Sequence, residues 1–190
     1  MTFEDFLKAI ERGDPRRHVS DFLLFQSPFI FEGAPALYNE FRAELTSALR
    51  VPGRSIAIVG SSQLGFSLSP QTMGAVIRAD SDIDVVVVSE PHFDQAWLEL
   101  NELDRDRWRL EGVTAARMER CRVDLFWGFI RLWQLPRSLR VARSWLPVFD
   151  RLSTDVRFGR RRVGGRLYRT WAQVEIDYSR SIRNARVPKG

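Results

Sequence analysis

Cysteine, lysine and histidine are all scarce in this 190-residue chain. Cys121 is the only cysteine, which excludes an intramolecular disulfide and is typical of a reducing compartment. It stands in an apolar run, so we expect it to pack rather than to react. His18 and His92 have no cysteine or acidic ligand pattern around them, which argues against a zinc site. Lys8 and Lys189 are the only lysines, so the net charge of +5 comes almost entirely from arginine, a side chain suited to bidentate phosphate contacts.

Long apolar stretches are also absent from the sequence. No window approaches the roughly 18 apolar residues that a membrane-spanning helix needs. The first residues carry Glu4, Asp5 and Lys8 among apolar side chains, unlike a signal peptide. We therefore expect no membrane partner and a cytoplasmic location. Hydrophobic residues make up 44% and charged residues 28% of the chain, the balance of an ordinary folded domain.

Apolar residues at helical spacing predict several amphipathic helices. The first carries a capping box, because Thr2 is followed three residues later by Asp5. Proline-rich residues 14–35 read as loop with short ordered pieces. The expected helices are residues 3–12, 36–49, 91–103 and 171–186, with a helical segment at 132–152 that Pro136 and Pro147 interrupt.

Short β-branched and apolar runs predict strands between these helices. They lie at residues 55–59, 83–88 and 121–126, and a basic strand or hairpin is expected at 157–166. The sequence therefore predicts an α+β domain with a mixed β-sheet, flanking helices and a short C-terminal helical region. We divide it into an N-terminal helical region (1–53), a core (54–130) and a helical, basic C-terminal extension (131–190).

Two carboxylates stand at the start of the expected strand 83–88. Because side chains alternate along a strand, Asp82 and Asp84 point the same way. Such carboxylates repel one another unless a divalent cation lies between them, and Mg²⁺, or Mn²⁺ in its place, is the natural candidate. The alternative is that the acids simply solvate an exposed strand end.

A turn and a third acid complete the candidate site. Gly60, Ser61 and Ser62 follow the strand 55–59, where a glycine permits close backbone approach and free amides and hydroxyls can receive a phosphate. Asp124 stands in the apolar run 121–126, where a lone charge is costly unless it is paired or liganded. A salt bridge to Arg122 or Arg143 is the alternative for Asp124.

This order of motifs resembles the DNA-polymerase-β-like nucleotidyltransferase superfamily: a hydrophobic strand, Gly-Ser, a spacer, Asp-hydrophobic-Asp on a second strand and a further aspartate. The resemblance covers about residues 55–126. It implies that Gly60, Ser61 and Ser62 contact the phosphates of a nucleoside triphosphate such as ATP, and that Asp82, Asp84 and Asp124 bind two magnesium ions and are catalytic. The implied reaction moves a nucleoside monophosphate to an acceptor hydroxyl.

The chain departs from the family pattern in two respects. The spacer of 20 residues between Ser61 and Asp82 is longer than usual, which predicts an inserted loop at 63–78. Only 64 residues follow Phe126, whereas many members add a full helical domain.

The acceptor stays open between RNA, a protein and another nucleotide. Six arginines of the basic C-terminal stretch could follow a nucleic-acid backbone, or contact only the triphosphate, or form a solvated face; they are Arg157, Arg160, Arg161, Arg162, Arg166 and Arg169. Trp127, Phe129 and Trp133 fit core packing better than base stacking. The alternatives to an enzyme are an inactive nucleotide- or RNA-binding module and an antitoxin-like partner protein.

Overall fold

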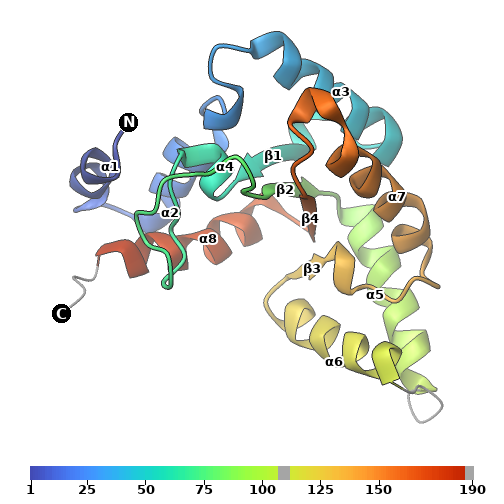
Figure 1. Ribbon diagram of the computed structural model, residues 1–190. Helices are drawn as coiled ribbons and strands as arrows, with labels where there is room; N and C mark the ends of the chain where they lie inside the picture. The colour runs from blue at the N-terminus through green and yellow to red at the C-terminus, as the bar shows by residue number, and fades with distance from the viewer. Residues whose placement is uncertain (107–111, 187–190) are drawn as a thin grey trace.

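The computed structural model describes residues 1–106 and 112–186, and its centre is a four-stranded mixed sheet (Figure 1). The strands are β1 (Ile56–Val59), β2 (Ile83–Val88), β3 (Phe129–Arg131) and β4 (Val163–Tyr168), in the order β1-β2-β4-β3. β1 pairs with β2 antiparallel, β2 with β4 parallel, and β4 with β3 antiparallel. The expected α+β class and mixed sheet are confirmed.

The two faces of the sheet bury different sets of side chains. Along β2, Ile83, Val85 and Val87 belong to one hydrophobic cluster, whereas Val86 and Val88 belong to the other. Asp84 lies on the Val86 face because side chains two apart share a face. The strand register aligns Val59, Asp84 and Gly164 across that face.

Helices cover both faces (Figure 1). The Ile83 face packs against α3 (Pro35–Leu49), α5 (Glu90–Arg105), α6 (Gly112–Phe126) and α7 (Arg140–Thr154). The Asp84 face packs against α1 (Phe3–Ile10), α2 (Pro15–Val19), the π-helix η1 (Ser20–Leu24) and α8 (Trp171–Arg186). Single turns occupy Phe29–Phe31 (η2), Gly53–Ser55 (η3), Ser61–Leu64 (α4), Leu132–Gln134 (η5) and Val156–Phe158 (η6). Within the described residues, no helix combines the length and apolarity that crossing a membrane requires.

Most expected helices are found where the sequence places them. The capping box of α1 forms, with the Asp5 amide donating to Thr2 Oγ1 at 3.1 Å. α8 buries Val174, Tyr178 and Ile182, the face that the sequence predicts. The expected interruption at Pro147 is wrong, because Pro147 lies inside α7; the segment 132–152 is one turn followed by this helix, which continues to Thr154.

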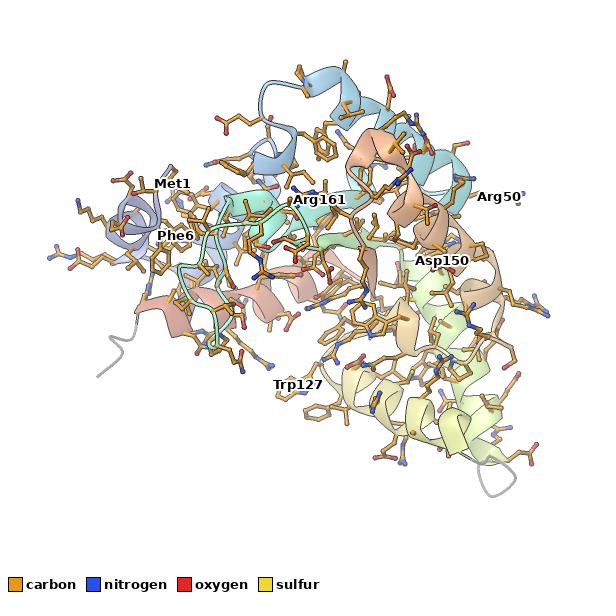
Figure 2. The ribbon with its side chains drawn as sticks, in the orientation of Figure 1. Met1, Phe6, Arg50, Trp127, Asp150 and Arg161 are labelled. Carbon is orange, nitrogen blue, oxygen red and sulfur yellow. The ribbon has the colours of Figure 1, made fainter. Side chains whose placement is uncertain are left out.

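The segment expected to be an inserted loop is held against α1. An antiparallel bridge joins Phe66 to Val76, and the Phe66 ring lies 5.3 Å from the rings of both Phe3 and Phe6. Figure 2 shows the Phe6 side chain among the aromatic groups beside this loop. The loop is therefore tied to the N-terminal helix by aromatic packing.

The prediction of a strand at residues 121–126 is wrong. These residues form the last turns of α6, and Met118 and Cys121 are buried on one side of that helix with Leu125 packed beside them. A spacing of three and four residues is the helical period, and the six-residue run was too short to show it. The strand or hairpin expected at 157–166 is confirmed in part, because β4 begins at Val163, whereas residues 156–158 form a turn.

Gly165 gives a direct test of the packing between β4 and α7. A Cβ at this position would lie 2.6 Å from both Leu132 Cδ1 and Phe149 Cζ. We expect Gly165→Ala to lower the free energy of unfolding by about 1–3 kcal/mol, because the core must shift to admit the methyl group. Urea unfolding followed by circular dichroism measures this change.

Gly53→Ala is the matched control, because its Cβ would meet its nearest neighbour, Arg42 Nη2, at 3.5 Å, an ordinary contact. We expect its effect to stay within about 0.5 kcal/mol. An unchanged stability of Gly165→Ala would contradict the described packing.

Candidate functional site

The turn after β1 brings the backbone against Asp84. Gly60 has φ +70° and ψ −149°, a conformation that a residue with a side chain rarely adopts. A Cβ on Gly60 would lie 3.2 Å from Asp84 Oδ2, a tight contact that adds to the strain of a side chain at this φ. The backbone at Gly60 therefore lies close against the Asp84 carboxylate.

A second glycine flanks Asp84 from the other neighbouring strand. A Cβ on Gly164 of β4 would lie 3.8 Å from Asp84 Oδ1 and 3.5 Å from Trp133 Cζ3. The carboxylate therefore sits in a slot between β1 and β4 with glycine on each side. Its partial burial raises the pKa of Asp84, Arg166 opposes this shift, and the nearby Asp82 adds to it.

Asp82 lies just before β2 and is more exposed than Asp84. Its Oδ2 is 3.0 Å from Arg162 Nη1, and the guanidinium of Arg162 lies 5.6 Å from the centre of the Trp133 ring. Arg161 Nη1 donates to the carbonyl oxygens of Arg78 and Ser81 at 2.8 and 3.2 Å. Figure 2 labels Arg161 near the centre of the molecule, above the sheet. Arginine side chains therefore gather where β2 begins.

A cavity of about 230 Å³ opens beside Asp84. Gly60, Ser61 and Asp84 line it from the sheet and its turn, together with Arg166 of β4 and Asp177 of α8. Within the described residues the buried Nε of Arg166 has no hydrogen-bond partner. The cavity thus offers one partly buried carboxylate and one incompletely satisfied guanidinium.

Asp177 is engaged within the chain. Its Oδ2 accepts a hydrogen bond from the Tyr168 hydroxyl at 2.6 Å and lies 3.5 Å from Arg166 Nη1. The Arg166 guanidinium also lies 5.8 Å from the centre of the Tyr178 ring. These contacts join β4 to α8 and fix the position of Arg166 in the cavity wall.

Ser62 is buried, with 1% of its surface exposed, and does not line this cavity. Its hydroxyl donates to the carbonyl oxygen of Asp82 at 2.6 Å. The structure therefore gives Ser62 a positioning role that ties α4 to the start of β2. Of the three residues expected to contact phosphate, Gly60 and Ser61 line the cavity.

The structure does not bring Asp124 together with Asp82 and Asp84. Asp124 lies near the end of α6 and forms an ion pair with Arg131 of β3 at 3.3 Å, and the Arg131 amide donates to Asp124 Oδ2 at 3.4 Å. One orientation of the Gln134 amide completes the group, with distances of 3.1 Å to Asp124 and 3.0 Å to Arg131. The expectation that Asp124 lies on a neighbouring strand was wrong. A salt bridge is what the structure shows, with Arg131 in place of Arg122 or Arg143.

Asp82 and Asp84 offer the oxygen ligands that Mg²⁺ prefers. Over residues 1–106 and 112–186, no group of three His, Cys, Asp or Glu side chains is placed to hold a metal ion. The residues present thus fit a cation held by two carboxylates and completed by ligands from outside the chain. They do not fit the three-acid site that the sequence predicts.

Most of the arginines expected to follow a nucleic-acid backbone have partners within the chain. Arg157 pairs with Glu40, Glu44 and Asp155, and Arg169 pairs with Glu90 and Asp94. Arg162 and Arg166 contact Asp82 and Asp177, as described above. The basic stretch is therefore largely neutralised.

The aromatic residues after α6 differ in exposure. Phe129 is buried, as expected for core packing. Trp127 is 44% exposed and carries the Arg180 guanidinium 3.7 Å from its ring centre, and Figure 2 shows it at the outer surface beside α6. Trp133 is partly buried beside Gly164 and Arg162, next to the Asp84 slot.

Sequence reasoning listed Arg166 only as one of six arginines that could contact a nucleic acid or a triphosphate, and it missed Tyr168 and Asp177. One signal was available, because Arg166 is a lone charge in the strand Val163–Tyr168, the same argument that selected Asp124.

No family model, curated protein or solved structure matches this chain.

The raised pKa of Asp84 predicts how stability depends on pH. The folded chain holds this proton more tightly than the unfolded chain, whose ordinary value is 3.8. The contribution of Asp84 to stability is therefore greatest at low pH and falls as pH rises through the folded pKa. We expect Asp84→Asn to be more stable than the natural chain at pH 7, with the difference shrinking as pH approaches 3.8.

Urea unfolding of both proteins across this pH range measures the effect. Asp80→Asn, which removes a carboxylate that is 73% exposed, is the control, and its effect should stay within about 0.5 kcal/mol at every pH. A destabilised Asp84→Asn at neutral pH would mean that attraction to Arg166 outweighs desolvation.

Asp124 is expected to matter for stability. Asp124→Ala removes a buried acceptor of charged hydrogen bonds, and we expect it to lower the free energy of unfolding by about 1.5–3 kcal/mol. Glu119→Ala breaks the exposed pair with Arg122 on the same helix and should cost less than about 1 kcal/mol. Equal effects in the two variants would refute a structural role for the Asp124 pair.

Proposed function

We propose that the cavity beside Asp84 binds the phosphate groups of a magnesium–nucleoside triphosphate, so that the chain is a nucleotide-binding domain of the nucleotidyltransferase type. One observation carries this proposal: the Asp84 carboxylate lies in a glycine-flanked slot, two residues from Asp82 and against the turn that presents Ser61.

The size and charge of the cavity support a phosphate ligand. A volume of about 230 Å³ is below the roughly 300–1,000 Å³ of pockets that enclose whole drug-sized ligands. It suits a phosphate group, with the rest of the nucleotide extending outward. Arg166 lines the cavity, and its guanidinium is a side chain of the kind that pairs with phosphate oxygens.

Magnesium fits the proposal as a partner of the nucleotide. Asp82 and Asp84 would hold it, and phosphate oxygens and water would complete its shell. The ion would neutralise phosphate charge when bound. Ser61 and the backbone of Gly60 would then position the phosphates, and Ser62 would keep the turn in register with β2 through its bond to Asp82.

Nucleotidyl transfer from the bound triphosphate is the second candidate function, and the adjacent carboxylates of Asp82 and Asp84 favour it. We place it second because Asp124 is committed to Arg131, so the third carboxylate that the resemblance implies is not supplied from that position. An acceptor hydroxyl on RNA, a protein or another nucleotide belongs to this second proposal.

The proposal predicts binding that needs both magnesium and the β2 carboxylates. Asp82→Asn and Asp84→Asn should each weaken the binding of labelled ATP or GTP by roughly 10–100-fold in magnesium, since a charged contact contributes about 1.5–3 kcal/mol. Isothermal titration calorimetry with and without chelator measures this, and chelator should weaken binding to the natural chain similarly.

Asp124→Asn and Asp80→Asn serve as matched controls because neither carboxylate lines the cavity. Both should bind nucleotide as the natural chain does. Loss of binding in Asp124→Asn, with the fold intact by circular dichroism, would move the site to β3 and overturn the proposal.

Transfer is tested separately, by incubating the chain with radiolabelled triphosphate, magnesium and total RNA or cell extract. Label that appears in a polymer or protein and is lost in Asp84→Asn supports the enzyme. Magnesium-dependent binding without label transfer supports the binding domain alone. Absence of both, with another protein co-purifying, supports a partner protein instead.

A further inference from the structure

A second cavity, of about 540 Å³, is lined in part by the end of η1. Leu23 of η1 lines the Asp84 cavity, whereas Leu24 lines the second one. Helix α8 also contributes to the wall of both cavities, with Tyr178 lining the Asp84 cavity and Trp171 lining the second cavity. The second cavity reaches the outer edge of the sheet, where Ala57 of β1 forms part of its wall.

Two arginines give this cavity positive charge. Arg42 of α3 donates from Nη2 to the carbonyl oxygen of Gly53 at 2.7 Å, but its buried Nε has no partner in the described part of the chain. Arg54 of η3 also lines the cavity. Among the described residues neither arginine has a carboxylate within ion-pair distance, and the one acid in the wall, Glu175, accepts a hydrogen bond from Ser20 at 2.9 Å.

Aromatic rings form much of the remaining wall. Tyr38 is held by stacking on Phe31, with ring centres 5.4 Å apart and an interplanar angle of 28°, and the Arg42 guanidinium lies 5.5 Å from the centre of the Tyr38 ring. Trp171 is partly buried at the first position of α8. Phe25, at the cavity wall, is 82% exposed.

We propose that this cavity binds a small planar aromatic molecule that carries an anionic oxygen group, either a phosphate or a carboxylate. The anionic group would pair with Arg42 and Arg54, and the ring would pack against Tyr38, Trp171 and Phe25. The volume lies within the range of pockets that enclose small-molecule ligands. This site is separate from the proposed nucleotide site, because none of its lining residues lines the Asp84 cavity.

The test uses the full chain without magnesium and four probes measured by saturation-transfer NMR and equilibrium dialysis. Adenosine monophosphate and indole-3-carboxylate carry both a ring and an anionic group, whereas adenosine and inorganic phosphate each lack one of them. We expect at least one of the first two to bind at least tenfold more tightly than adenosine and phosphate. The member of the pair that binds identifies the anionic group as phosphate or carboxylate.

Variants assign that binding to the cavity. Arg54→Gln and Arg42→Gln should each weaken it at least tenfold; Arg54→Gln is the decisive variant because Arg42 also holds Gly53 in place. Arg50→Gln is the matched control, because Arg50 is exposed at the end of α3 and lies outside the cavity wall (Figure 2). Asp84→Asn should bind the probe normally even if the nucleotide site fails its own test.

Three outcomes would overturn the proposal. They are the absence of binding by both ring-bearing anions, unchanged binding in Arg54→Gln, and loss of binding in Asp84→Asn. The last would show that the probe occupies the Asp84 cavity instead.

Discussion

The arrangement of the candidate site depends on the narrow slot that holds the Asp84 carboxylate. Strand pairing places Asp84 between the end of β1 and the start of β4, and a Cβ at Gly60 would make a tight contact of 3.2 Å with its Oδ2. The slot excludes water from the Asp84 carboxylate, which raises its pKa. The ionised carboxylate therefore lowers the stability of the fold at neutral pH. A cost of this kind commonly marks a group kept for binding or chemistry rather than for stability.

The long amphipathic elements could be predicted from the sequence because they contain enough residues for the spacing of their apolar side chains to show a helical or strand period. α8 buries Val174, Tyr178 and Ile182 at a spacing of four residues, and β2 carries an unbroken β-branched run beside its acids. Residues 121–126 offered only six positions, over which a buried helix and a buried strand look alike. The buried side of α6 extends to Met118, outside that run, and α6 packs against β3 and the turn after it.

Half of the candidate site could be predicted for a similar reason. Two pairs of residues lie at the ends of strands that the sequence itself predicts: Asp82 and Asp84 at the start of β2, and Gly60 and Ser61 directly after β1. The local sequence pattern was therefore enough to place them. The remainder depends on which distant strand lies beside β2. That neighbour is β4, some 80 residues later, so the charged side chain facing the cavity from it is Arg166, and Asp124 instead meets Arg131 on the outer strand.

An arginine in this position changes what the two acids can hold. Arg162 and Arg166 lie close to Asp82 and Asp84, so a lone divalent cation would face two positive charges as well as two negative ones. A phosphate ligand alone would be repelled by the negative charges of the two carboxylates. A cation and a phosphate bound together remove both difficulties, since each neutralises the groups that repel the other. The charges around the slot are therefore consistent with the metal–nucleotide complex that we propose as its ligand.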